Sequence, residues 1–139
     1  MLGVLLRWEV VLFVLLNLCA GLAFVINIKK TLELLHRKNL EVAPGKVWYL
    51  LIPGLNIIFH FIMNKKVTQS LYNEFECHQW NTRPVNAAYN LGIVMGIFNI
   101  LMLLPIGGIF FWFAFTVLFF AYWAGLYILR QFLFLNLND

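Results

Sequence analysis

The chain has 139 residues, of which 63% are hydrophobic and only 12% are charged, and its formal net charge is +4. A soluble domain is closer to half apolar and a quarter charged, so the excess apolar surface of so short a chain must face lipid. The basic residues cluster beside apolar runs, as they do near anionic lipid headgroups, so we expect a single-domain (residues 1–139), all-α integral membrane protein in the lipid bilayer, with no nucleic acid partner.

The first apolar run, residues 8–28, is long enough to cross about 30 Å of hydrocarbon at about 1.5 Å per residue. It ends at Lys29 and Lys30 rather than at a small-residue cleavage site, so we expect an uncleaved span and not a signal peptide. The helical spacing of the leucines that follow predicts that the helix continues to about Lys38. His36 lies among basic residues there and is expected to be solvated in a loop.

The second embedded segment, residues 47–63, is apolar but contains residues that interrupt a helix. Pro53 lacks an amide hydrogen and suits the first turn of a helix, so the segment is expected to break there. Asn56 and His60 carry donors and acceptors that can satisfy the backbone groups freed by the break. Pro53, Asn56 and His60 are therefore the candidate polar site at the helix break.

The positions of the ten Lys and Arg residues distinguish two arrangements of this segment. If all four embedded segments cross the membrane, five basic residues fall on each face and no orientation is indicated. If residues 47–63 dip into the membrane and return to the same face, nine lie on one face and Arg7 alone lies on the other. The dip satisfies the positive-inside rule better, and protein neighbours can satisfy the backbone of a re-entrant turn. A kinked helix that crosses the membrane is the alternative.

Residues 64–80 form a predicted amphipathic helix that continues from the second segment. Val67, Leu71 and Phe75 recur at every fourth position, and the residues between them are largely polar. We expect this apolar face to lie on the membrane surface or on a partner chain.

The third and fourth segments, residues 87–104 and 107–129, are joined by a short apolar turn and are expected to form an antiparallel hairpin. Each carries small residues at every fourth position, and such ridges let two membrane helices approach closely. The fourth segment is rich in aromatic residues, which we interpret as lipid-facing bulk with interfacial belts. The candidate helix-packing residues are Ala88, Gly92 and Gly96 in the third segment and Ala121 and Gly125 in the fourth.

Residues 44–75 resemble a pattern of small bacterial multi-span membrane proteins of unknown function. The pattern combines a Pro-Gly turn, an aromatic residue, Ile-Pro and an asparagine, and it ends in Ser-Leu-x-x-Glu-Phe. The resemblance implies a multi-pass protein of the bacterial cytoplasmic (inner) membrane and implies no activity; Gly54 and His60 depart from the pattern. The matching positions are Pro44, Gly45, Trp48, Ile52, Pro53, Asn56, Phe61, Lys66, Ser70, Leu71, Glu74 and Phe75.

Catalytic and metal-binding signatures are missing from these segments. Of the three histidines, His36, His60 and His78, only His60 lies in an embedded segment, so neither a metal site nor a haem is expected. Ser70 and Glu74, one turn apart, are expected to form a surface or capping hydrogen bond rather than a nucleophile and its base. We therefore expect no enzyme and no cofactor.

Two functions are compatible with these features. The first is a non-catalytic accessory or assembly subunit of a larger inner-membrane complex, since small-residue ridges and an amphipathic face indicate partners among other membrane protein subunits. The alternative is an oligomeric small-solute or ion transporter or channel component, because carriers build their sites at broken membrane helices. One chain of 139 residues offers too few helices to enclose a path by itself.

Overall fold

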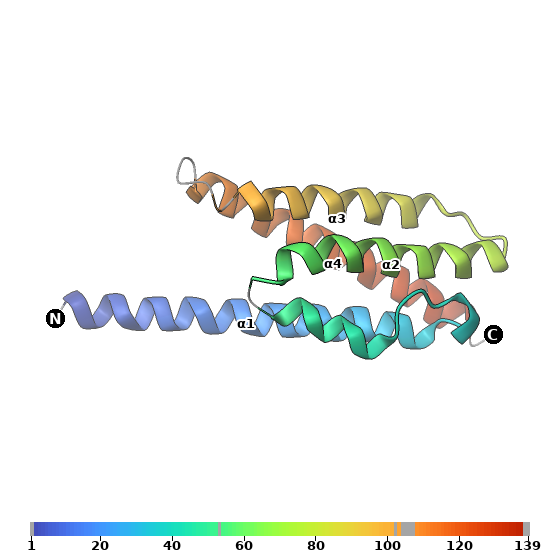
Figure 1. Cartoon of the computed structure of the whole chain (residues 1–139), viewed down its shortest axis with the longest axis horizontal. Coiled ribbons are helices and arrows are strands. Elements are labelled where there is room, and N and C mark those ends of the chain that lie inside the picture. Colours follow the sequence, from blue (N-terminus) through green and yellow to red (C-terminus); the bar gives the residue numbers. More distant parts are fainter. Residues whose placement is uncertain (1, 53, 102, 104–107, 138–139) are drawn as a thin grey trace.

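The computed structural model of the chain describes residues 2–52, 54–101, 103 and 108–137 (Figure 1). This part of the chain is helical and contains no strand, which confirms the predicted all-α class. The α-helices are α1 (Leu2–Leu34), α2 (Asn56–Cys77), α3 (Arg83–Leu101) and α4 (Gly108–Leu137), and the 3₁₀ helices η1 (Arg37–Asn39) and η2 (Pro44–Leu51) lie between α1 and α2.

Three helices of the described part are long and apolar enough to cross a membrane. They are α1 over Val14–Leu34, α3 over Arg83–Leu101 and α4 over Phe110–Leu137, and by length and composition they make the chain a multi-pass membrane protein. α1 continues past residue 28, as predicted, but ends at Leu34 and not at about Lys38, and α4 extends past the predicted end of its segment at residue 129. Many of their large apolar side chains are exposed, which suits contact with lipid.

The segment predicted as the second embedded one, residues 47–63, is divided into two helices. η2 ends at Leu51 and α2 begins at Asn56, and Gly54 between them has a φ of 81°. This left-handed backbone conformation is one that glycine adopts without strain, so Gly54 permits the turn. η2 runs back alongside α1, and α2 then returns towards the end of the molecule where η2 begins (Figure 1). Pro53, predicted to cause the break, lies outside the described residues.

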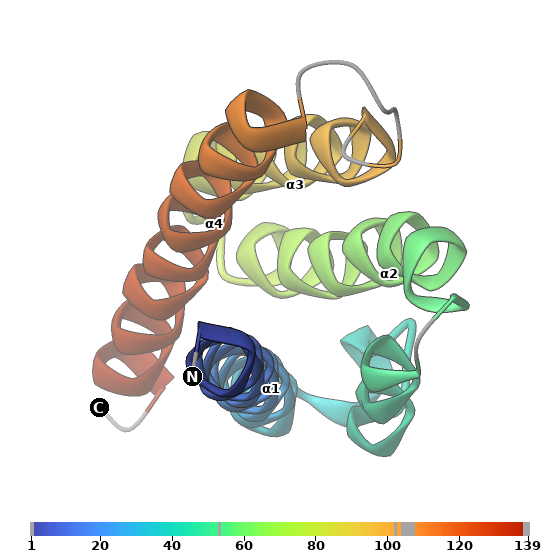
Figure 2. The same ribbon diagram turned by 90° about the vertical axis from the view of Figure 1, so that its left-hand side faces the viewer.

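The helices are arranged around α2, which lies between α3 on one side and α1 with η2 on the other (Figure 2). α4 packs along one side of this arrangement and contacts both α3 and α1. The carboxyl ends of α1, α2 and α4 and the amino end of α3 lie at one end of the molecule (Figure 1). We call this the charged end, because Lys30 and Arg130 lie there and line a hollow of about 380 Å³ between α1 and α4.

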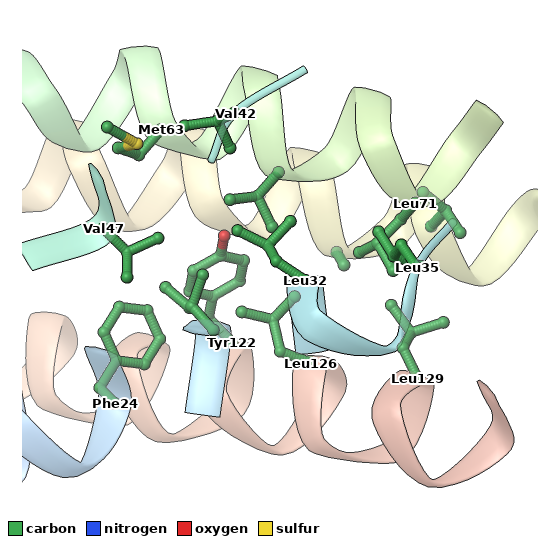
Figure 3. Packing of buried hydrophobic residues seen from close by; sticks show 14 of the residues in the cluster. Phe24, Leu32, Leu35, Val42, Val47, Met63, Leu71, Tyr122, Leu126 and Leu129 are labelled. Atoms are coloured by element: carbon green, nitrogen blue, oxygen red, sulfur yellow. The ribbon is translucent and has the colours of Figure 1, made fainter. Parts of the chain in front are cut away.

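The core corrects one prediction about residues 64–80. Val67, Leu71 and Phe75 are 1%, 0% and 2% exposed, so their apolar face is covered by the chain itself. Leu71 packs in a cluster with Leu35 of the segment after α1 (Figure 3). The Phe75 ring lies 5.5 Å from the Phe132 ring of α4. This face is therefore not available to a membrane surface or a partner chain, because α1 and α4 already occupy it.

The small residues of α3 face α2 at close range. Ala88, Gly92 and Gly96 are buried. A β-carbon at Gly92 would lie 2.6 Å from the Asn64 side-chain Cγ, and one at Gly96 would lie 2.7 Å from the Phe61 ring. Both approaches are shorter than real β-carbon contacts, so the two backbones meet only because α3 lacks side chains at these positions.

The small residues of α4 make no comparable contact, which corrects the second predicted ridge. Ala121 is exposed, and a β-carbon at Gly125 would meet nothing within 4 Å among the described residues. α4 instead packs through its large side chains, since Tyr122, Leu126 and Leu129 are buried. Ala121 and Gly125 lie on other faces of the helix.

Candidate functional site

Two polar clusters are built on α2, one at its amino-terminal half and one at its carboxyl end. The first contains the predicted site residue His60, which is buried, and its ring Nε2 lies 2.8 Å from the Gly92 carbonyl oxygen of α3. Because a carbonyl only accepts hydrogen bonds, Nε2 carries the proton and donates. Asn56 is exposed at the start of α2, one turn before His60. Asn56 and His60 lie on one side of α2 because they are four residues apart on the helix, and Pro53 lies outside the described residues.

Asn64, one turn after His60, completes the first cluster. Its Nδ2 donates to the Tyr89 carbonyl oxygen of α3 at 3.1 Å, and the Tyr122 hydroxyl of α4 donates to its Oδ1 at 2.8 Å. The Asn64 amide is buried and therefore ties three helices together with both of its polar ends satisfied. This network binds the helices to one another and leaves no free polar group on Asn64 for a ligand.

A cavity of about 70 Å³ lies beside the helix break. It is lined by Asn56 and His60 of α2, Asn99 of α3 and apolar residues that include Phe119. This volume admits a few water molecules but not a path across the membrane. The cavity is the part of the predicted site that is open to a small ligand.

The second cluster was not predicted and is centred on Glu74, near the charged end. The Glu74 side chain is fully buried. Its Oε2 accepts hydrogen bonds from the Asn39 Nδ2 at 2.7 Å and from the His36 backbone N–H at 3.0 Å. Its Oε1 lies 2.5 Å from the His36 Nδ1 and 3.6 Å from the His78 Nδ1. One carboxylate therefore holds the segment after α1 against the end of α2.

Hydrogen bonding keeps this carboxylate ionised. Burial by itself raises the pKa of the Glu74 carboxyl, but hydrogen bonds from Asn39 and His36 outweigh burial and hold that pKa below its ordinary value. Glu74 is therefore an anion at neutral pH. A buried anion is stable only beside hydrogen-bond donors, and the Asn39 side chain and the His36 backbone N–H supply them here.

Ser70 adds a second tie between the same two segments. Its Oγ accepts a hydrogen bond from the Glu41 backbone N–H at 2.8 Å and donates one to the Lys66 carbonyl oxygen at 2.8 Å. The predicted hydrogen bond between Ser70 and Glu74 is not formed, because the single hydroxyl proton of Ser70 is donated to the Lys66 carbonyl oxygen. Both residues instead hold residues 36–41 on α2.

The end of α2 positions His78 beside Glu74. Gln79 has a left-handed φ of 58°, and the Trp80 N–H donates to the Phe75 carbonyl oxygen at 2.9 Å, which closes the helix. The Trp80 ring then stacks on the His78 ring with centroids 4.5 Å apart, and the His36 ring lies 5.8 Å from that of His78. The imidazoles of His36 and His78 thus converge on the Glu74 carboxylate.

The sequence contains one signal for this cluster. Glu74 lies three residues after Leu71 and next to Phe75, so on a helix it falls on the apolar face. A carboxylate on a face that becomes buried requires hydrogen-bond partners. The sequence around His36 contains no comparable signal, and His36 was expected to be solvated in a loop.

The comparisons with known proteins give no match: no protein-family model, curated protein or solved structure is significantly similar to this chain. The resemblance of residues 44–75 to small bacterial membrane proteins therefore stays a prediction.

Proposed function

We propose that the chain is a non-catalytic integral membrane protein that serves as a small accessory or assembly subunit of a larger complex in the bacterial inner membrane. The observation that supports this function best is the amino-terminal half of α1. Every described side chain from Val11 to Cys19 is exposed, and this half of the helix extends beyond the other helices (Figure 1). The chain therefore contains a long apolar stretch of helix that its own fold does not cover.

Such a stretch is suited to packing against another membrane helix. α1 has 33 residues, which corresponds to about 50 Å of helix, more than the roughly 30 Å of a hydrocarbon core. Within a membrane, helices associate through van der Waals packing that replaces contacts with lipid. Leu12, Leu15 and Leu16 are all exposed and offer this packing to a second chain.

A transporter component is the second candidate, and the cavity beside the helix break favours it. Asn56, His60 and Asn99 line that cavity, and polar groups at a broken helix are where carriers bind ions and substrates. With three candidate crossing helices in the described part, several copies of the chain would have to enclose the path.

Native purification followed by mass spectrometry distinguishes these functions. We expect a stoichiometric partner protein to copurify with the chain, and the triple variant Leu12→Ala, Leu15→Ala, Leu16→Ala to lose it. A matched triple variant on the exposed face of α4, Phe113→Ala, Val117→Ala, Phe120→Ala, should keep the partner. A homo-oligomer without partner that conducts ions in liposomes would overturn the subunit proposal and support the transporter.

We also propose that residues 47–63 enter the membrane and return to the same face. η2 and α2 together leave and return to the charged end (Figure 1), and α2 is not among the three helices with the length and composition of a span. A segment that enters and returns places nine of the ten basic residues on one face, which is the orientation signal that membrane insertion follows.

Cysteine labelling in sealed membrane vesicles tests the dip. In a chain whose native Cys19 and Cys77 are replaced by alanine, we expect Lys38→Cys and Thr82→Cys to react with an impermeant maleimide from the same side. Leu103→Cys, two residues past the end of α3, should react only from the opposite side. Labelling of positions 38 and 82 from opposite sides would show that residues 47–63 cross the membrane.

A further inference from the structure

The cluster at the charged end has the composition of a transition-metal site. One ring nitrogen of His36, one ring nitrogen of His78 and a Glu74 carboxylate oxygen all lie within 4.8 Å of one another. Two imidazole nitrogens with one carboxylate oxygen form a ligand set that Zn²⁺ and similar divalent ions take in proteins. The three residues come from two segments, the chain after α1 and the end of α2, so the set exists only in the folded chain.

The Glu74 carboxylate is oriented for such a role. Its Oε2 is held by the Asn39 Nδ2 at 2.7 Å and by the His36 backbone N–H at 3.0 Å. These donors leave Oε1 directed at both imidazoles. Metal-binding carboxylates are commonly fixed by hydrogen bonds to the oxygen that does not bind the ion, so Asn39 is a positioning residue in this arrangement.

The distances fit a bound ion after a small movement. Ligand atoms around a tetrahedral Zn²⁺ lie about 2.0–2.1 Å from the ion and hence roughly 3.3 Å from one another. The Glu74 Oε1 is 3.6 Å from the His78 Nδ1, which is close to that separation, and 2.5 Å from the His36 Nδ1. The shorter distance is that of a hydrogen bond between the two atoms, whose place a bound ion would take. The His36 side chain is 55% exposed, so its ring has room to move away from the Glu74 Oε1 until the two atoms reach the separation that an ion requires.

A purely structural role for Glu74 does not require the second imidazole. Asn39 and the His36 backbone already satisfy Oε2, and the His36 ring already satisfies Oε1. His78 nevertheless lies at the same oxygen, and its ring is held there by the stacked Trp80 ring. The His78 Nδ1 also lies 3.0 Å from the Glu74 carbonyl oxygen, a hydrogen bond that it would exchange for a bond to the ion.

We propose that His36, Glu74 and His78 bind one divalent transition-metal ion, with Zn²⁺ as the best-fitting ion, at the charged end of the chain. The ion clamps the segment after α1 to the end of α2. Three protein ligands leave a fourth position for water or for a side chain of another molecule. This site is independent of the proposed subunit function, and either one can hold without the other.

Metal titration of the purified, tag-free full chain in detergent micelles tests the proposal. After removal of metal with a chelator, we expect Zn²⁺ to bind with one ion per chain by calorimetry, and Co²⁺ to give the visible absorption bands of a tetrahedral site. His36→Asn and His78→Asn should each weaken binding by about 100-fold or more, and Asn39→Ala by about 10- to 100-fold. The histidine variants change partly exposed side chains, so circular dichroism should show them folded even if Glu74 variants are not.

Matched variants identify the ligand set. Glu76→Gln, an exposed carboxylate on the same helix, and Cys77→Ser, a thiol beside His78, should bind Zn²⁺ and Co²⁺ as the natural chain does. The proposal is overturned if the chain binds no Zn²⁺ at neutral pH, or if either histidine variant binds it unchanged. Loss of binding in Cys77→Ser would equally overturn it, because the site would then contain a different ligand.

Discussion

Replacing Glu74 with alanine is expected to lower the free energy of unfolding by about 2–4 kcal/mol, because the donors left behind are buried and unpaired. The Asn39 Nδ2 and the His36 backbone N–H both donate to Oε2, and the segment that carries them is also held to α2 by Ser70, by the Asn73 side chain and by apolar packing. Detergent-induced unfolding, followed by tryptophan fluorescence in the presence of a chelator, measures this loss without any contribution from bound metal.

Glu76→Ala provides the control for this substitution. Glu76 lies on the same helix but is exposed, so its removal should change the free energy of unfolding by no more than about 0.5 kcal/mol. Equal effects of Glu74→Ala and Glu76→Ala would contradict the view that Glu74 ties the two segments together.

The same carboxylate makes stability depend on pH in the acid range. The pKa of Glu74 is lower in the folded chain than its ordinary value, so the folded state binds fewer protons than the unfolded state in this range. The stabilisation is therefore complete above about pH 4.5 and is lost as the pH falls through the lower folded-state pKa. In Glu74→Gln this component of the acid dependence should disappear. The measurement is the free energy of unfolding as a function of pH, compared between the natural chain and this variant.

Local sequence pattern accounts for the helices and for the break in the second segment. Continuous apolar runs predict α1, α3 and α4, and Pro53 predicts a break in the second segment, because these are properties of the backbone at those positions. The role of Gly54 in the turn follows from the structure. The spacing of the apolar residues in residues 64–80 predicts an apolar helix face, but it does not predict that this face is buried inside the chain. Which surface covers such a face depends on the path of the rest of the chain, and here α1 and α4 fold over it.

The Glu74 cluster could not be assembled from sequence because its members are far apart in the chain. His36 and Asn39 precede Glu74 by 38 and 35 residues, and they reach it only through the turns between α1 and η2. The position of Glu74 on an apolar face indicates that it needs partners, but no spacing rule identifies them. The candidate site at the break was easier to predict, since Asn56 and His60 lie one turn apart on a single helix.

Gly92→Ala is expected to lower the free energy of unfolding by about 2–4 kcal/mol, since it combines overpacking with the loss of a buried hydrogen bond. The new β-carbon would lie 2.6 Å from the Asn64 Cγ and 2.7 Å from its Nδ2. Asn64 cannot move aside freely, because Tyr89 and Tyr122 hold both ends of its amide. Either α3 withdraws from α2 or the amide gives up these partners.

Gly125→Ala on α4 is the matched control, since a β-carbon there would meet nothing within 4 Å among the described residues. Alanine is also the better helix former, by about 1 kcal/mol, so this variant should be as stable as the natural chain or more stable. If both glycine variants lose the same stability, the cost arises from the backbone and not from the contact with Asn64.

A double-mutant cycle assigns the cost of Gly92→Ala to the Asn64 amide. Asn64→Ala removes the three atoms that the new β-carbon would overlap, and by itself it leaves the buried Tyr122 hydroxyl without its acceptor. We expect Gly92→Ala to cost at least about 1 kcal/mol less in the Asn64→Ala background than in the natural chain, the coupling typical of residues in direct contact. Strict additivity of the two substitutions would mean that α2 and α3 do not meet at Gly92 as the structure has them.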